Sequence, residues 1–111
     1  DVLTGSPSVV DTATLVVDGH RVLLMGLEGL TGEYARGLQT FITSYGNSVT
    51  CTLLEQGPYY RCVTASQNVD VAEAALLNGA AKTNDSATPS QKAKEAQSRS
   101  AGRGVWANTG Q

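Results

Sequence analysis

The 111-residue sequence predicts an α+β fold in which five β-strands form a small barrel and three α-helices pack against it. Short runs of β-branched and apolar residues, separated by turn residues, fill most of the first 65 positions, as is typical of strands. Apolar residues recur at helical spacing over 32–44, and helix-forming residues dominate after residue 70. A chain of this length forms one domain with a modest core. We therefore expect a folded domain over 9–106, a flexible lead-in or short edge strand over 1–8, and a tail over 107–111.

Three strands are predicted first: one short strand, and after it two strands that form a hairpin. Short strands over Val9-Val10 and Thr14–Val17 precede Asp18-Gly19, which suits a two-residue type I′ turn because both turn positions require positive φ. A dense apolar run then extends the third strand from His20 to Leu27. A glycine-containing corner, Gly26–Gly29, closes this strand, and we expect the three strands to supply the inner wall of the barrel.

An amphipathic helix is predicted from Gly32 to Ser44. Its apolar residues recur three and four positions apart, namely Tyr34, Ala35, Leu38, Phe41 and Ile42. Thr31 is the expected N-cap, and Glu33 places negative charge in the first turn, where the helix dipole favours it. Gly37 lowers the intrinsic stability of a helix by about 1 kcal/mol relative to alanine, so tertiary packing must hold this segment. The pair Gly46-Asn47 predicts its end.

A second hairpin is predicted from Ser48–Glu55 and Tyr59–Ala65, joined at Gln56-Gly57-Pro58. Cys51 and Cys62 are equidistant from the centre of this turn, so in a regular hairpin they face each other at a separation that a disulfide can bridge. Closing such a loop contributes about 3 kcal/mol in the chain-entropy model. A disulfide would also indicate an oxidising compartment, periplasmic or secreted. The alternative is a pair of small buried thiols.

The C-terminal third is predicted to be mostly helical. Asp70–Ala81 forms a short helix with Asp70 as its N-cap, and a polar loop follows over Thr83–Ser90. Gln91–Gly102 is rich in helix formers and is expected to be a solvated helix that lies against the body. Val105-Trp106 is predicted to be a hydrophobic plug that pins the C-terminus.

Four strings between Val9 and Trp106 together resemble one known family. They are TLVVDGHRVLLMGLEG at 14–29, YYR at 59–61, NVDVAEAALLNGAAK at 68–82 and EAQSRSAGRGVW at 95–106. In this order they resemble the DGDT-to-PE region, the D-YGR strand, the G-DVNE helix and the GLW ending of the staphylococcal-nuclease-like (thermonuclease) family. The resemblance implies an OB-fold-like five-stranded barrel with three attached helices. Secreted bacterial members of that family often carry a cysteine pair in this hairpin.

The resemblance also implies a site, because active members hydrolyse DNA and RNA with calcium, two aspartates, a glutamate and two arginines. Carrying these positions over gives, in chain order, Ala13, Leu23, Glu28, Thr31 and Arg61. Only Arg61 matches the family, whereas Leu23 removes a charge-stabilising donor and the loss of one such donor costs on the order of 100-fold in rate. We therefore expect no catalytic residue and no calcium. The alternative is a shifted site that uses Glu28, Glu33 and Asp11.

Other candidate chemistry is sparse. His20 is the only histidine and lies beside the Asp18-Gly19 turn, where we expect a solvated turn residue rather than a general base. One histidine and two cysteines are too few for a zinc site, so no metal or other cofactor is expected. Alternation along the strand sends one of Tyr59 and Tyr60 inward and the other outward. Both are ordinary strand aromatics or, together with Arg61, part of a stacking or docking surface.

The charges of the chain are distributed unevenly. Residues 1–81 carry three basic and eight acidic side chains, whereas residues 82–111 carry five basic and two acidic ones. An acidic body is a poor partner for a polyanion, so nucleic-acid binding is expected to be weak or absent. The basic C-terminal helix is a solvated face or a docking patch for an acidic partner. The longest apolar run is far short of the roughly 20 residues that a membrane span needs, so no membrane insertion is expected.

The sequence therefore predicts a catalytically inactive nuclease-like domain that serves binding or scaffolding. We expect it to be a processed or excised module of a larger exported protein, with protein or polysaccharide as its partner. The expected contact region is a cleft near Leu23, Glu28, Tyr60 and Arg61. The alternative is a nuclease or nucleic-acid binder with a rearranged site, which would show calcium-dependent turnover or salt-sensitive DNA binding.

Overall fold

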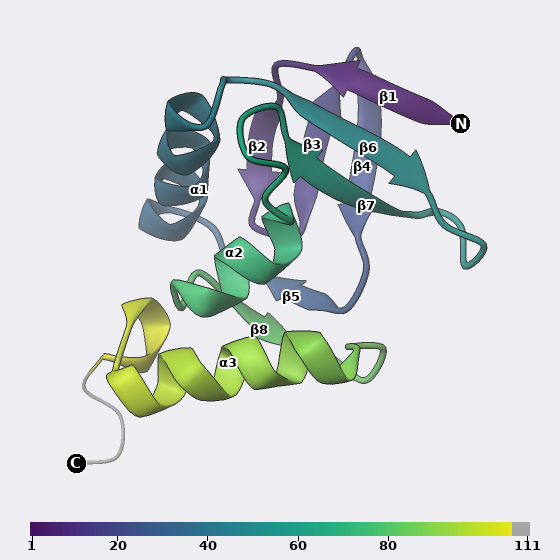
Figure 1. Cartoon of the computed structure of the whole chain (residues 1–111). Coiled ribbons are helices and arrows are strands. Elements are labelled where there is room, and N and C mark those ends of the chain that lie inside the picture. The colour runs from purple at the N-terminus through teal and green to yellow at the C-terminus, as the bar shows by residue number, and fades with distance from the viewer. Residues whose placement is uncertain (108–111) are drawn as a thin grey trace.

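A curved six-stranded mixed sheet forms one half of the molecule, and helices cover one side and one end of it (Figure 1). The computed structural model describes residues 1–107. The strands are β1 (Val2–Gly5), β2 (Ser8–Asp11), β3 (Thr14–Val17), β4 (His20–Leu24), β5 (Leu27–Gly29), β6 (Val49–Leu53), β7 (Tyr59–Thr64) and β8 (Ala81–Thr83). The helices are α1 (Glu33–Ser44), α2 (Val71–Leu77), α3 (Pro89–Ala101) and the 3₁₀ turn η1 (Gly104–Trp106). The predicted α+β class with three α-helices is confirmed.

The sheet is not the closed five-stranded barrel that the sequence predicts. Its strand order is β1-β6-β7-β4-β3-β2, so β1 and β2 lie at opposite edges although only Ser6 and Pro7 separate them in the chain. Pro7 has no N–H to donate to a strand. Gln39 of α1 bonds this bend instead, accepting the Val9 N–H at 2.9 Å and donating to the Pro7 carbonyl at 3.1 Å. The Gln39 side chain thus supplies the hydrogen bonds at the bend between the two edge strands, β1 and β2.

The N-terminal residues contain a strand that belongs to this sheet. Of the two alternatives for residues 1–8, the edge strand is observed, because β1 pairs with β6 from Val2 opposite Thr52 to Gly5 opposite Val49. Leu3 packs partly against the core, so β1 contributes apolar burial as well as backbone hydrogen bonds. The fold among the described residues therefore begins at Val2 and not at Val9.

The β3–β4 hairpin forms as predicted, and the strand after it is shorter. Asp18 and Gly19 both have positive φ, at 52° and 75°, as a type I′ turn requires. β4 ends at Leu24 instead of Leu27, since the chain turns at Gly26, where φ is 89°. The expected corner is itself a strand, β5, which leaves the large sheet and pairs with β8.

Helix α1 has the predicted extent but a different cap. Its N-cap is Gly32, with φ 62° and ψ −130°, and no side chain caps the helix, so the expected Thr31 cap is wrong. Gly32 occupies a backbone conformation that a residue with a side chain rarely adopts, and this sets the direction of entry into the helix. Ala35, Leu38 and Ile42 point into the core.

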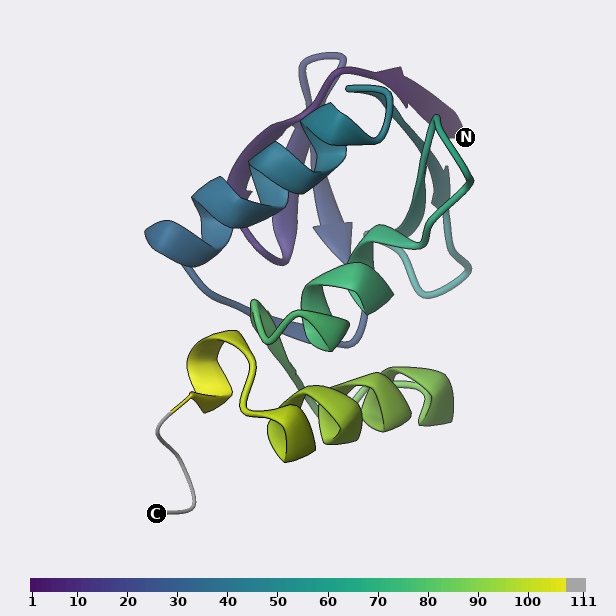
Figure 2. The ribbon, with the colours of Figure 1, turned by 60° about the vertical axis from the view of Figure 1, so that its left-hand side comes forward.

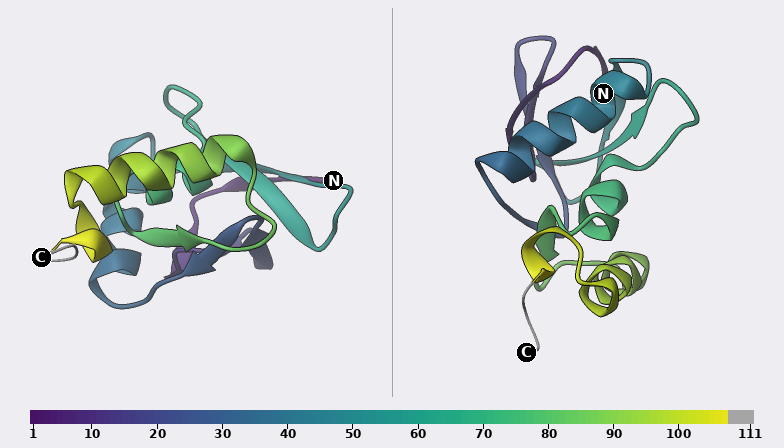
Figure 3. Two further views of the ribbon diagram at one scale, coloured as in Figure 1. Left: turned by 90° about the horizontal axis from the view of Figure 1, so that it is seen from below. Right: turned by 90° about the vertical axis from the view of Figure 1, so that its left-hand side faces the viewer.

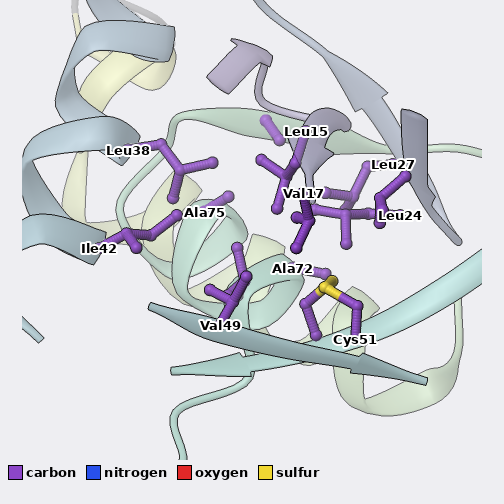
Figure 4. Close-up of a cluster of buried hydrophobic side chains, with 14 of the residues drawn as sticks. Leu15, Val17, Leu24, Leu27, Leu38, Ile42, Val49, Cys51, Ala72 and Ala75 are labelled. Carbon is purple, nitrogen blue, oxygen red and sulfur yellow. A yellow bond between two sulfur atoms is a disulfide. The ribbon is translucent and has the colours of Figure 1, made fainter. Parts of the chain in front are cut away.

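The second hairpin carries the predicted disulfide. β6 and β7 pair with Cys51 directly opposite Cys62, and the two sulfur atoms are bonded. Both cysteines are buried against the apolar core, which gathers residues from β3, β4, α1, α2 and β6 (Figure 4). The disulfide therefore ties the hairpin at a point where it also closes the core.

The C-terminal elements differ from the prediction at their boundaries. α2 ends at Leu77, and Ala81 begins β8, so the expected helix over 70–81 is too long. α3 begins at Pro89, within the expected loop, because Thr88 and Gln91 form a capping box with proline at the start. α3 lies along α2 on the side away from the large sheet (Figures 2 and 3).

The predicted plug at Val105-Trp106 is half-buried in η1 and held by specific contacts. The Val105 N–H donates to the Gly79 carbonyl at 2.8 Å. The cationic groups of Lys82 and Arg99 lie 5.4 Å and 4.8 Å from the Trp106 ring centroid. Residues 108–111 of the expected tail lie outside the described residues.

Candidate functional site

The residues around Tyr60 and Arg61 form a small pocket with mixed polar and apolar walls, of about 150 Å³, where β7 meets the beginnings of α2 and α3. In addition to these two side chains, its lining includes a carboxylate pair, an amide, a hydroxyl and three apolar groups: Asp70, Glu73, Gln91, Thr88, Met25, Leu54 and Ala72. We call it the Tyr60–Arg61 pocket. Its volume accommodates one ring or one side chain, but not a stretch of nucleic acid.

An ion pair lies on one wall of this pocket. The Arg61 Nε donates to the Asp70 Oδ2 at 3.0 Å, with the Arg61 side chain 61% exposed and that of Asp70 17% exposed. The other Asp70 oxygen accepts the Glu73 N–H at 3.0 Å and thereby caps α2. Among the described residues, the two terminal nitrogens of Arg61 make no hydrogen bond. Asp70 thus orients the guanidinium and offsets its charge.

The opposite wall is a hydrogen-bonded bridge between α3 and the end of β4. Buried Gln91 accepts the Thr88 N–H at 3.0 Å and donates to the Met25 carbonyl at 2.9 Å. Glu73 accepts the Ser90 hydroxyl at 3.0 Å, which joins α2 to α3. A side chain at Gly26 would collide with the Gln91 amide. These bonds fix the positions of the polar groups around the pocket.

The sequence reasoning missed these α2 and α3 contributors. The cleft expected from the sequence lay near Leu23, Glu28, Tyr60 and Arg61. The signal that could have located the α3 wall is Thr88-Pro89-Ser90-Gln91, a capping-box pattern with proline at the first helical position. No comparable local signal places Asp70 against Arg61, because that contact joins a strand to the next helix.

Apart from Arg61, the positions expected to correspond to catalytic residues do not line this pocket. Ala13 lies in the turn between β2 and β3, where its N–H donates to the Asp11 Oδ1 at 2.7 Å. This turn packs on Gly29, at which a side chain would collide with Asp11 and Ala13. Buried Thr12 bonds Leu30 in both directions, at 3.0 Å and 2.8 Å. Asp11 is therefore part of a structural turn.

Leu23, Glu28 and Thr31 are also distributed over separate elements. Leu23 is opposite Tyr59 where β4 and β7 run parallel. Glu28 is exposed on β5, opposite Lys82 of β8, and Thr31 is exposed before α1. The expected cleft near Leu23, Glu28, Tyr60 and Arg61 is thus wrong in part, because only Tyr60 and Arg61 line the pocket. The reason is that β5 leaves the sheet after Gly26 and carries Glu28 away.

The two tyrosines alternate as predicted. Tyr59 is 37% exposed, whereas Tyr60 is half-buried, packs against the core and lines the pocket. Tyr59 does not line the pocket, so its place in a stacking surface with Tyr60 and Arg61 stays a prediction. His20 is an exposed turn residue whose Nδ1 lies 2.8 Å from the Asp18 carbonyl, as expected for a solvated turn.

Within residues 1–107, no three side chains among His, Cys, Asp and Glu come together in an arrangement that could hold an ion. Asp11, Glu28 and Glu33, the expected members of a shifted site, do not form such a group. Both cysteines are in the disulfide. No helix within the described range is long and apolar enough to cross a bilayer.

Comparison with known proteins leaves the chain without an assigned family. No protein-family model matches the sequence, and no curated protein matches it significantly.

Proposed function

We propose that this chain is a non-catalytic binding module of the nuclease-like type, and that its Tyr60–Arg61 pocket binds one hydroxyl-rich unit of a polysaccharide. The observation that carries the proposal is the Arg61–Asp70 ion pair at 3.0 Å in the pocket wall. An arginine that serves phosphate chemistry presents an uncompensated charge to the developing anion. Here a carboxylate already compensates that charge.

The balance of charges in the pocket favours a neutral ligand over an anionic one. Arg61 is the one cationic residue of the lining, and Asp70 and Glu73 contribute two carboxylates. A phosphate placed against the guanidinium would also face these carboxylates, and like charges brought together disfavour binding. Nucleic acid is therefore a poor ligand for this pocket.

The remaining groups are suited to a sugar ring. Tyr60 provides an aromatic surface beside the apolar Met25 and Leu54, and carboxylate, amide and hydroxyl groups surround it. Binding sites of this kind combine apolar contact with a few fixed polar groups that set orientation. A volume of about 150 Å³ limits the pocket to one ring, so a polymer would lie across it and be gripped at one unit.

The strand connections support an open variant of the OB-like architecture. β1 and β2 are successive segments at the two edges of one curved sheet, β4 and β7 run parallel, and α1 connects the two hairpin regions. An OB-like barrel whose two edge strands are not joined by hydrogen bonds would have this arrangement. The family assignment itself stays a proposal from the sequence resemblance.

The location that we propose is the periplasm or the exterior of the cell. The Cys51–Cys62 disulfide is compatible with an oxidising compartment, where such bonds persist. Both compartments also contain polysaccharides, which agrees with the proposed ligand class.

The first test is a nuclease assay with calcium and single-stranded DNA, combined with calorimetric titration of calcium into the same sample. We expect no turnover and no heat of binding. Calcium-dependent turnover that is lost in Glu28→Gln and Arg61→Ala would contradict the proposal and establish a rearranged nuclease site.

The second test is binding to a microarray of neutral and anionic bacterial glycans. We expect neutral glycans to bind, and Tyr60→Ala and Glu73→Gln each to weaken binding at least about tenfold, a change of roughly 1.4 kcal/mol. Tyr59→Ala is the matched control, because Tyr59 neighbours Tyr60 but is outside the pocket. Glu73→Gln keeps the shape of the wall if Tyr60→Ala is poorly folded. Preference for anionic glycans, or equal loss with Tyr59→Ala, would refute the assignment.

A further inference from the structure

A second hollow surface lies between α1 and α2 and adjoins the Tyr60–Arg61 pocket at Asp70 and Glu73. Two adjoining hollows of about 280 Å³ and 310 Å³ share Phe41 and Asn78 as common wall residues. From α1 and its C-cap, the lining is Glu33, Tyr34, Gly37, Leu38, Phe41 and Tyr45. We call this surface the α1–α2 groove. Both helices lie on the same side of the molecule, as Figure 2 shows.

The groove wall on α1 is aromatic and only partly covered by the core. Phe41 and Tyr45 are stacked, with ring centroids 4.4 Å apart, and Tyr34, Phe41 and Tyr45 are only half-buried, although Phe41 also packs against the core. The fully buried stripe of α1 is Ala35, Leu38 and Ile42, of which Leu38 also borders the groove. From Glu33 to Tyr45 the wall is roughly 18 Å long, at 1.5 Å per helical residue, enough for about three turns of a partner helix.

Gly37 marks the point of closest access to the groove. A glycine within a helix lowers its stability relative to alanine, so it needs a reason. The fold supplies none, since a side chain built at Gly37 meets no atom within 4 Å. Gly37 nevertheless lines the groove, where the missing side chain leaves the helix backbone open to close approach. A docked side chain from another molecule would account for both facts.

The charges around the groove indicate the sign of its occupant. Its charged lining residues are Glu33 at one end and Asp70, Glu73 and Lys94 at the other. Because Asp70 is paired with Arg61, the carboxylates of Glu33 and Glu73 remain against the single ammonium group of Lys94. Residues 1–81, which supply all of these except Lys94, carry eight acidic and three basic side chains. A partner with basic residues flanking its apolar anchors therefore has complementary charge.

We propose that the α1–α2 groove docks a short helical segment of a partner protein that carries two large apolar anchors and flanking Lys or Arg side chains. One anchor fills the hollow beside Gly37 and the other fills the hollow between Phe41 and Leu77. This is the helix-in-groove mode of recognition, in which apolar side chains about two turns apart provide the affinity. The α1–α2 groove and the Tyr60–Arg61 pocket share Asp70 and Glu73, whereas Gly37, Phe41 and Leu77 line the groove alone.

The test uses a phage-displayed library of random 12-residue peptides, selected on the intact protein. We expect the enriched peptides to carry two large apolar residues and a net positive charge. A fluorescein-labelled synthetic copy of the most enriched peptide should bind at least tenfold more weakly to Gly37→Gln, and more weakly as salt rises. Thr40→Gln, an exposed change on the same helix but outside the groove lining, is the matched control and should bind like the parent.

The Gly37 variants keep the test decisive. Gly37→Ala should raise the melting temperature, because it removes a helix-interior glycine where the space is open. Gly37→Gln should therefore fold, so loss of peptide binding reports on the groove. Three outcomes would overturn the proposal: no peptide is enriched, the enriched peptides are acidic, or the enriched peptides bind Gly37→Gln as tightly as the parent protein.

Discussion

Asp70 joins helix α2 to strand β7 through three interactions of one residue. Its side chain caps α2 and pairs with Arg61, and its backbone forms an isolated bridge with Val63 of β7. The helix cap was predictable from the sequence, because Asp before an apolar helical pattern is a strong N-cap signal. The ion pair was not, because it depends on where β7 places Arg61.

Substitution of Asp70 separates these two contributions. Asp70→Ala should lower the free energy of unfolding by about 1 kcal/mol through loss of the cap. Asp70→Asn keeps a capping oxygen and loses only the ion pair, so it should cost less than about 0.5 kcal/mol, since Arg61 is mostly exposed. Urea denaturation of the three proteins provides the measurement. Equal losses in both variants would show that the ion pair, and not the cap, carries the effect.

Among the helices and strands, those with a strong local sequence pattern were predicted correctly, and those with a weak pattern were not. The Asp18-Gly19 hairpin and the facing cysteines follow from turn chemistry and register, which are local properties. β5 and β8 have three residues each and exist because they pair with each other. Their sequences carry no period by which a strand could be recognised.

The disulfide should contribute strongly to the stability of the hairpin. Replacing Cys51 and Cys62 together by alanine should lower the free energy of unfolding by about 3 kcal/mol, because the closed loop no longer restricts the unfolded chain. The measurement is chemical denaturation of the variant and of the parent. Addition of a thiol reductant is the control, since it should destabilise the parent and leave the double variant unchanged. A reductant effect of similar size on both proteins would contradict this account.

At the scale of the whole molecule, β1 makes the first eight residues an edge of the sheet, which was one of the two alternatives expected for them. It pairs along β6 and contributes Leu3 to the edge of the core. The bend at Ser6-Pro7 then carries the chain to the opposite edge, where Gln39 binds it. The sheet is thereby curved without being closed.

Removal of residues 1–5 should therefore destabilise the fold. We expect a loss of more than about 2 kcal/mol, because several ladder hydrogen bonds, each contributing roughly 0.5–1.5 kcal/mol, are lost together with the burial of Leu3. Val2→Thr is the control, since Val2 is 59% exposed and the strand remains. Thermal and urea denaturation both measure the effect. An unchanged midpoint after truncation would mean that this segment is only a lead-in.

Local sequence patterns were enough to predict the α+β class, the first hairpin, the register of the two cysteines and the main helices, because turn residues and apolar periodicity act over a few positions. The three-dimensional arrangement was needed to see that Arg61 faces Asp70, that Glu28 lies on a separate small sheet, and that α3 and its cap bring Gln91 and Thr88 to the pocket. These contacts join segments far apart in the chain. They depend on how the sheet curves and where β5 leaves it, which no local pattern specifies.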